Sequence, residues 1–187
     1  MRDLKAKPQI LNVSTAARSQ HFHIEAVALR FSNGNECVFE RLAGTPTAGT
    51  VIIVAVPRPG TVLLVREYAV GLDRYELSLP TGRIEPSETV LESANRELAE
   101  ETGYRASHVE RLHTLSLAPG IFGYQAEIVL ARNLEPAPLH EDEVEVPEVI
   151  EWPLRKLEHI IRTGEITEAR TLAALFLARD RIRLSRP

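Results

Sequence analysis

Residues 82–104 read GRIEPSETVLESANRELAEETGY, and the rest of the chain is arranged around this stretch of spaced glycines and charged residues. Its spaced positions are Gly82, Glu88, Arg96-Glu97, Glu100-Glu101 and Gly103, with apolar residues at Leu98 and Tyr104. From average residue usage, a match at all of these positions arises by chance on the order of once in a million sequences of this length. The pattern therefore indicates a functional motif.

The middle of this stretch predicts a helix over roughly residues 88–102. Ser87 or Thr89 can supply the N-cap, and Gly103 can end the helix. Glu97 and Glu101 then lie one turn apart on one face, with Glu100 beside them. Apolar residues recur at helical spacing between these caps, at Val90, Leu91, Ala94 and Leu98.

Carboxylates gathered at the C-terminal end of a helix are electrostatically unfavourable. Each poorly screened negative charge there costs about 0.3–1 kcal/mol because the helix dipole is already negative. Like charges about 5 Å apart repel by about 3 kcal/mol at an effective dielectric constant of about 20. Hard oxygen ligands grouped in this way suit Mg²⁺ or Mn²⁺, which also bridge substrate phosphates. A solvated acidic helix face is the alternative interpretation.

The stretch resembles the Nudix box of the Nudix hydrolases. This resemblance implies an α/β/α sandwich, with the box as a loop-helix-loop, that hydrolyses nucleoside diphosphates linked to another group. Glu97 and Glu101 are expected to bind Mg²⁺, or Mn²⁺, directly. Glu100 is expected to assist catalysis or to bind a second ion, and the carbonyl of Thr81 can complete the metal shell. Arg96 is expected to orient these glutamates, and Glu88 is expected to pair with Arg96 or to bind the metal through water.

Composition restricts the class of protein further. A chain of 187 residues with 44% apolar content can bury one good core with a small appended subdomain. A net charge of −4 without a long basic run argues against nucleic-acid or membrane-surface binding. The single cysteine, Cys37, cannot form an internal disulfide. The N-terminus lacks the apolar core of a signal peptide, so we expect a cytoplasmic protein.

The N-terminal part predicts a β-hairpin. Residues His21–Phe31 and Glu36–Leu42 alternate as strands do, and Asn33-Gly34 between them is a hairpin signal. The small and Pro-bearing stretch 44–49 is typical of a linker. We therefore expect a hairpin dimerisation subdomain at 1–45 and a catalytic Nudix domain at 46–187. An isolated hairpin is marginally stable, so it must pack on the main domain or on a second subunit.

The remainder of the chain predicts an α/β or α+β fold, because strands alternate with helices late in the sequence. Glu135–Glu148 is an acidic, Pro-bearing loop of a length typical of functional loops. Helices are expected from Pro153 to about Thr163 and over about Glu168–Arg183. The expected strands are Thr50–Val56, Thr61–Arg66, Arg74–Leu79, His108–Leu117, Gln125–Leu130 and Val149–Trp152.

Outside the box, the chain resembles the ADP-sugar branch of the family and, more closely, the bacterial ADP compounds hydrolases. The residues that carry this likeness are PQILNVSTAAR (8–18), FSNG (31–34), FER (39–41), REYAVG (66–71), YELSLPTG (75–82) and EARTLAALFL (168–177). It implies metal-dependent hydrolysis of ADP-ribose, NADH or diadenosine polyphosphates with release of AMP. ADP-ribose pyrophosphatases often carry Arg at the position that Ala69 occupies here, and Glu shortly after the position of Pro119-Gly120. This chain has neither residue, so the preferred compound stays open.

The same resemblance assigns substrate contacts. The branch forms homodimers in which the N-terminal strands of one subunit help to build the substrate pocket of the other. Glu40 and Arg41 should approach the nucleoside end of the substrate, and Arg66 and Glu67 should lie near its phosphates. Ion pairs between adjacent strands are the alternative role for these residues.

The general base is expected on the acidic loop. Glu141, Glu143 and Glu145 are the candidates, with Glu145 favoured, and a solvated surface acid is the alternative for each. Aromatic side chains could stack on adenine or belong to the core, namely Tyr75, Phe122 and Tyr124.

Three alternative functions stay open at the level of sequence. The chain could be a Nudix-fold nucleotide-binding or regulatory module without turnover, although an intact box disfavours this. It could hydrolyse another nucleotide sugar. An isomerase on the same fold would need a catalytic thiol, and Cys37 lies far from the box in sequence.

Overall fold

The computed structural model describes residues 6–43, 49–138 and 145–184. The described chain forms two compact units. We name Met1–Thr45 with Ser116–Tyr124 the N-terminal unit, and Pro46–Leu115 with Gln125–Pro187 the main unit. Most of the predicted linker at 44–49 lies outside the described residues, as do Glu141 and Glu143. The domain assignment made from the sequence, 1–45 and 46–187, stays a prediction.

The N-terminal unit is an antiparallel sheet of β1 (Gln9–Arg18), β2 (His23–Arg30) and β3 (Glu36–Leu42), in that order. The predicted hairpin is present as β2–β3. Its turn places Gly34 at φ +85°, a conformation that glycine adopts without strain. Strand β1 was not predicted, because its large apolar residues, Ile10, Leu11 and Val13, lie only in its first half and all of its residues are exposed. The segment Ser116–Tyr124 joins this unit through the amide of Leu42, which donates to the carbonyl of Ile121 at 2.9 Å.

The main unit contains two sheets. One has the order β10-β5-β6, and the other has the order β7-β4-β9-β8 with β4 and β9 parallel. Every strand predicted here is present within a few residues, whereas β7 was missed because it is only three residues long. The bounds are β4 (Thr50–Val56), β5 (Thr61–Ala69), β6 (Arg74–Ser78), β7 (Thr81–Arg83), β8 (Tyr104–Ser116), β9 (Gln125–Pro136) and β10 (Glu148–Pro153).

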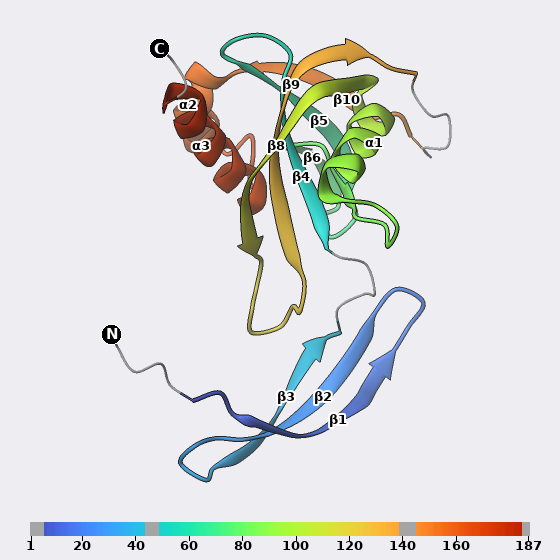
Figure 1. Ribbon diagram of the computed structural model, residues 1–187, viewed down its shortest axis with the longest axis vertical. Helices are drawn as coiled ribbons and strands as arrows, with labels where there is room; N and C mark the ends of the chain where they lie inside the picture. The colour runs from blue at the N-terminus through green and yellow to red at the C-terminus, as the bar shows by residue number, and fades with distance from the viewer. Residues whose placement is uncertain (1–5, 44–48, 139–144, 185–187) are drawn as a thin grey trace. The chain divides into compact units, whose positions relative to one another are not determined.

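Helices cover both faces of this strand arrangement (Figure 1). Helix α1 (Val90–Thr102) lies on one side, and α2 (Leu157–Thr163) and α3 (Ala169–Leu184) lie on the other, with a 3-10 turn η1 (Leu154–Lys156) before α2. The expected α/β/α Nudix sandwich is confirmed. The helix predicted from Pro153 begins instead with η1, so α2 is shorter than expected. Among the described helices, none combines the length and the apolar character needed to cross a membrane.

Strand β4 explains why the sandwich forms. Its interior residues are fully buried, and successive side chains point to opposite faces of the sheet. Val51, Ile53 and Ala55 pack in one cluster with Ala94 and Leu98 of α1. The intervening residues of β4 face the opposite side, which α3 covers. A near-continuous apolar run such as 51–56 is typical of a strand buried on both faces.

The N-terminus of α1 has a capping box. The amide of Glu92 donates to Oγ1 of Thr89 at 3.3 Å, and the amide of Thr89 donates to Oε2 of Glu92 at 2.8 Å. Of the two N-cap candidates in the sequence, the structure therefore selects Thr89. Gly103 ends the helix at φ +72°, as predicted. These caps hold the helix that carries the candidate metal ligands.

We expect Thr89→Ala to lower the free energy of unfolding by about 1 kcal/mol, because the hydroxyl that accepts from the amide of Glu92 and donates to its carboxylate is lost. Urea denaturation of the purified variant measures this change. Ser87→Ala is the matched control, since Ser87 is exposed and precedes the cap. An equal loss of stability in both variants would contradict the assignment of the cap to Thr89.

Candidate active site

The carboxylate of Glu97 lies against the backbone of Gly82. A Cβ atom placed on residue 82 would come within 1.7 Å of Cδ of Glu97 and within 2.1 Å of both of its carboxylate oxygens. Only glycine leaves room for the carboxylate at this point. The glycine that opens the motif therefore has a physical role that the sequence pattern alone did not reveal, namely to let α1 present Glu97 across β7.

Glu101 ties the last turn of α1 to β7. Its side chain is buried, with 6% of the residue exposed. The amide of Thr81 donates to Oε2 of Glu101 at 3.1 Å and to Oε1 at 3.4 Å. Thr81 thus meets the predicted metal ligand through its amide. The predicted role of its carbonyl in the metal shell stays a prediction.

Arg96 connects the glutamates of the motif. Its Nε and Nη2 donate to the two carboxylate oxygens of Glu88 at 2.8 and 2.9 Å, which confirms the expected pair. Its Nη1 donates to Glu97 at 2.8 Å and to Glu100 at 2.9 Å. Hydrogen bonding to Glu88 is the main cause of a raised pKa of Arg96, and Glu97 adds to it. The guanidinium therefore stays charged and holds these carboxylates together.

The charge balance of this cluster suits a divalent cation. Burial raises the pKa of Glu97 above its usual value, even though Arg96 donates to it. A partly desolvated carboxylate gains from further positive charge nearby. The oxygen donors, and the space that Gly82 leaves for one of them, fit Mg²⁺ or Mn²⁺. Within the described ranges, no three His, Cys, Asp or Glu side chains converge as a metal cluster. Because Nη1 of Arg96 donates to both Glu97 and Glu100, a cation bound by these carboxylates would compete with the guanidinium.

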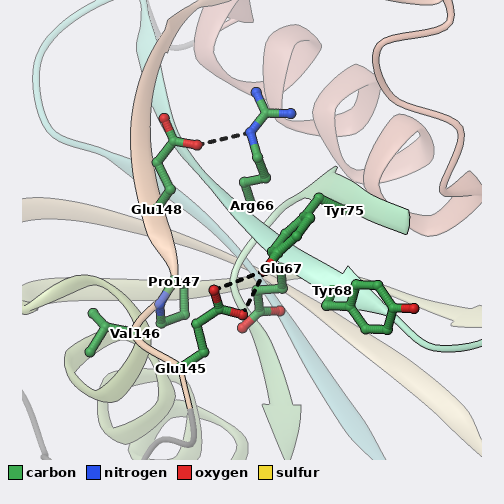
Figure 2. Close-up of a pocket in the computed structure, with 8 residues that line it drawn as sticks. All are labelled: Arg66, Glu67, Tyr68, Tyr75, Glu145, Val146, Pro147 and Glu148. Atoms are coloured by element: carbon green, nitrogen blue, oxygen red, sulfur yellow. Dashed lines mark hydrogen bonds and ion pairs between the residues drawn. The ribbon is translucent and has the colours of Figure 1, made fainter. Parts of the chain in front are cut away.

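A cavity of about 640 Å³ lies over the β5–β6 sheet (Figure 2). Nε of Arg66 donates to Oε2 of Glu148 at 2.9 Å, so Arg66 makes the ion pair between adjacent strands that was its alternative role. The hydroxyl of Tyr75 donates to Glu145 at 2.9 Å. Tyr75 is half-exposed and is not a core residue. The residues lining the cavity include Arg66, Glu67, Tyr68, Tyr75, Glu145 and Glu148.

The two predicted nucleoside contacts lie in the N-terminal unit. Glu40 and Arg41 line a cavity of about 490 Å³ together with Phe39, Ile121 and Phe122. Nε of Arg41 donates to Oε2 of Glu25 at 2.9 Å, and the two residues are direct cross-strand neighbours. Arg41 therefore also makes an ion pair between adjacent strands. Its cavity is largely apolar in residue type, as a nucleobase site would be.

Sequence reasoning missed the partners of several site residues. Two pairs were missed, Arg66 with Glu148 and Tyr75 with Glu145. Each pair joins residues about 70 to 80 positions apart in the chain. A single sequence gives no signal for such pairs. The cross-strand register of β5 with β6 and β10 is what brings them together.

Comparison with known domains defines the class of this protein. Residues 46–175 match the NUDIX domain, and residues 8–41 match the NudE-type Nudix hydrolase N-terminal domain. The chain therefore belongs to the Nudix hydrolase family, and the predicted enzyme class is confirmed. Nudix hydrolases in general depend on a divalent metal.

Individual relatives place the chain within this family. It is 43% identical to the ADP compounds hydrolase NudE of Escherichia coli (strain K12) over 93% of this chain and 92% of the relative. It is 30% identical to the ADP-ribose pyrophosphatase of Bacillus subtilis (strain 168), over 68% of this chain and 70% of that protein. A crystal structure of an ADP compounds hydrolase superposes with a TM-score of 0.89 at 42% identity, covering 96% of each chain. The predicted likeness to the bacterial ADP compounds hydrolases is confirmed.

Proposed function

We propose that this protein hydrolyses the diphosphate linkage of ADP-linked compounds and releases AMP. One observation carries the proposal: the sequence is 43% identical, over 93% of the chain, to a relative named as an ADP compounds hydrolase. The intact set of carboxylates on α1 supports turnover rather than binding alone: Arg96 holds Glu97 and Glu100, and Glu101 accepts from the amide of Thr81. Substrates of this class are ADP-ribose, NADH and diadenosine polyphosphates.

The metal in this proposal is Mg²⁺, with Mn²⁺ as a substitute. Glu97 and Glu101 would hold it directly, Glu100 would assist or hold a second ion, and the carbonyl of Thr81 would contribute an oxygen. A divalent cation supplies neutralisation of the diphosphate and activation of the attacking water. Arg96 holds Glu88 through Nε and Nη2, and it would keep these contacts if Glu97 and Glu100, which its Nη1 holds, bound a cation instead. Glu88 thus keeps the guanidinium in place when the other carboxylates change partner.

Arg66 and Glu67 are the proposed contacts near the phosphates. The Arg66 side chain is 42% exposed and shares an exposed ion pair with Glu148, and such pairs contribute only about 0–1 kcal/mol. A diphosphate can therefore compete for this guanidinium at low cost, and its oxygens match the guanidinium fork. Glu40 and Arg41 are the proposed contacts at the nucleoside end, where the apolar cavity beside Phe39 and Phe122 would take the base.

Glu145 is the proposed general base. It is exposed and lines the same cavity as Arg66 and Glu67. In the views of Figures 1 and 2, the segment that carries Glu145 lies beside α1, the helix of the proposed metal ligands. A carboxylate there can accept the proton of the attacking water while the phosphorus–oxygen bond to the leaving group breaks.

We further propose that the protein works as a homodimer in the cytoplasm. Support for the dimer comes from the N-terminal unit, whose sheet exposes large apolar side chains, with Ile10 at 58% and Val38 at 65%. Apolar side chains gathered on one small sheet are typical of protein–protein contacts. Light scattering coupled to size exclusion measures the mass directly, and a monomer at all micromolar concentrations would contradict the dimer.

We expect a substrate panel to identify the reaction. Purified protein with Mg²⁺ should release AMP from at least one of ADP-ribose, NADH and a diadenosine polyphosphate, and a chelator should abolish the release. Product analysis by liquid chromatography measures AMP and the phosphorylated remainder. UDP- and GDP-sugars in the same panel test for a hydrolase of another nucleotide sugar. Saturable binding of the ADP compounds without any product would instead support a binding module.

A further inference from the structure

Two tyrosines face each other across the β5–β6 ladder. Tyr68 and Tyr75 are direct cross-strand partners, and their ring centroids lie 5.6 Å apart at an interplanar angle of 73°. This edge-to-face arrangement is a favourable one for aromatic rings. The hydroxyl of Tyr68 donates to the carboxylate of Asp73 in the turn of the same hairpin. Both Tyr68 and Tyr75 are therefore held in place by neighbours on their own hairpin.

The hydroxyl of Tyr75 reaches out of this hairpin to Glu145. It lies 2.9 Å from Oε1 and 3.0 Å from Oε2 of that carboxylate, as Figure 2 shows. Hydrogen bonding to Glu145 is the main cause of a raised pKa of Tyr75, and the charge of Glu145 adds to it. The phenol therefore keeps its proton and remains a donor at neutral pH.

The chain around Glu145 has a second attachment three residues later. Glu148 accepts from Arg66 of β5, and the intervening Pro147 is buried. Tyr75 and Arg66 thus fix the two ends of residues 145–148 to neighbouring strands. If a substrate phosphate draws Arg66 away from Glu148, the hydrogen bonds from the Tyr75 hydroxyl still hold the carboxylate of Glu145.

We infer that Tyr75 is a positioning residue, whose hydroxyl orients the carboxylate of Glu145 for proton abstraction. This inference rests on the proposed function, in which Glu145 is the general base. A general base must lie within hydrogen-bond reach of the proton that it takes. A misplacement of about 1 Å can cost on the order of 100-fold in rate. An exposed glutamate has several rotamers available, so one fixed donor that selects among them has a direct kinetic effect.

Tyr75→Phe tests this inference, because it removes only the hydroxyl and keeps the ring that packs on Tyr68. We expect kcat to fall by about 10-fold with KM unchanged. Glu145→Gln should lower kcat by about 100-fold, as loss of a general base does. In the Glu145→Gln background, Tyr75→Phe should have no further effect, since the group that it positions is already inactive. Ser107→Ala, which removes an exposed hydroxyl on β8 outside the motif, is the control and should keep wild-type kcat.

Each other result would overturn the inference. A raised KM with kcat intact in Tyr75→Phe would mean that the Tyr75 hydroxyl binds substrate, for example by donating to a phosphate oxygen. An equal fall in kcat in the wild-type and Glu145→Gln backgrounds would mean that Tyr75 acts independently of Glu145. An unchanged kcat in Glu145→Gln would remove the base role of Glu145, and the inference with it, while AMP release by the wild type would leave the proposed hydrolase function standing.

Discussion

Glu101→Gln is expected to lower kcat by at least about 100-fold, equivalent to about 3 kcal/mol of transition-state stabilisation. The buried side chain of Glu101 is a proposed metal ligand, and an amide is a weaker ligand for Mg²⁺ than a carboxylate. Its amide oxygen can still accept from the backbone amide of Thr81, so the variant should keep its fold. Steady-state release of AMP from an ADP compound measures the loss, and thermal unfolding checks the fold.

Glu85→Gln is the matched control for this variant. Glu85 lies in the same motif and carries the same charge, but it is exposed and precedes the helix. We expect its kcat to stay within about two-fold of wild type, as for a surface substitution away from the site. Activity that falls equally in both variants would indicate a general dependence on negative charge, and the assignment of Glu101 as a ligand would then be wrong.

Gly82→Ala should produce the second largest loss of activity, again by on the order of 100-fold, with little loss of stability. The new Cβ would overlap the carboxylate of Glu97, which must swing away from its place over β7. The group in the way is the end of a flexible side chain, so the backbone can keep its path. The cost therefore falls on the position of the proposed ligand, where displacement by about 1 Å can have a large effect on rate. Parallel assays of kcat and of urea denaturation measure the two effects.

Gly71→Ala is the matched control for Gly82→Ala. A Cβ on residue 71 would meet no atom within 4 Å, and its backbone does not require positive φ. We expect this variant to retain wild-type kcat and stability. A Gly82→Ala protein that is fully active would show that Glu97 does not need its place over β7.

The fold could be predicted from the sequence where the pattern of side chains is local. Helix α1 follows from the spacing of its apolar residues and from its caps, and β4 follows from its continuous apolar run. Strand β1 could not be predicted, because its large apolar residues lie only in its first half and none of its residues is buried, so no buried face marks it in the sequence. The bounds of β9 were underestimated for the same reason, since its last residues are mostly exposed.

In the candidate site, too, local features could be predicted from the sequence, whereas contacts between distant segments could not. The sequence predicts which glutamates gather on α1, because helical spacing is local. It does not predict that Arg66 pairs with Glu148 or that Tyr75 pairs with Glu145, because these contacts depend on strand register. The fit of Glu97 against Gly82 is also a contact between β7 and α1 that only the folded chain shows.

Titration of the purified protein with Mn²⁺, followed by electron paramagnetic resonance, tests the metal site most directly. Bound Mn²⁺ loses its free-ion signal, so the assay reports binding without any need for turnover. We predict saturable binding to the wild type and to Glu85→Gln, displacement by excess Mg²⁺, and at least about 10-fold weaker binding to Glu97→Gln and Glu101→Gln. Equal Mn²⁺ affinity in all four proteins, or no binding to the wild type, would contradict a metal site formed by these glutamates.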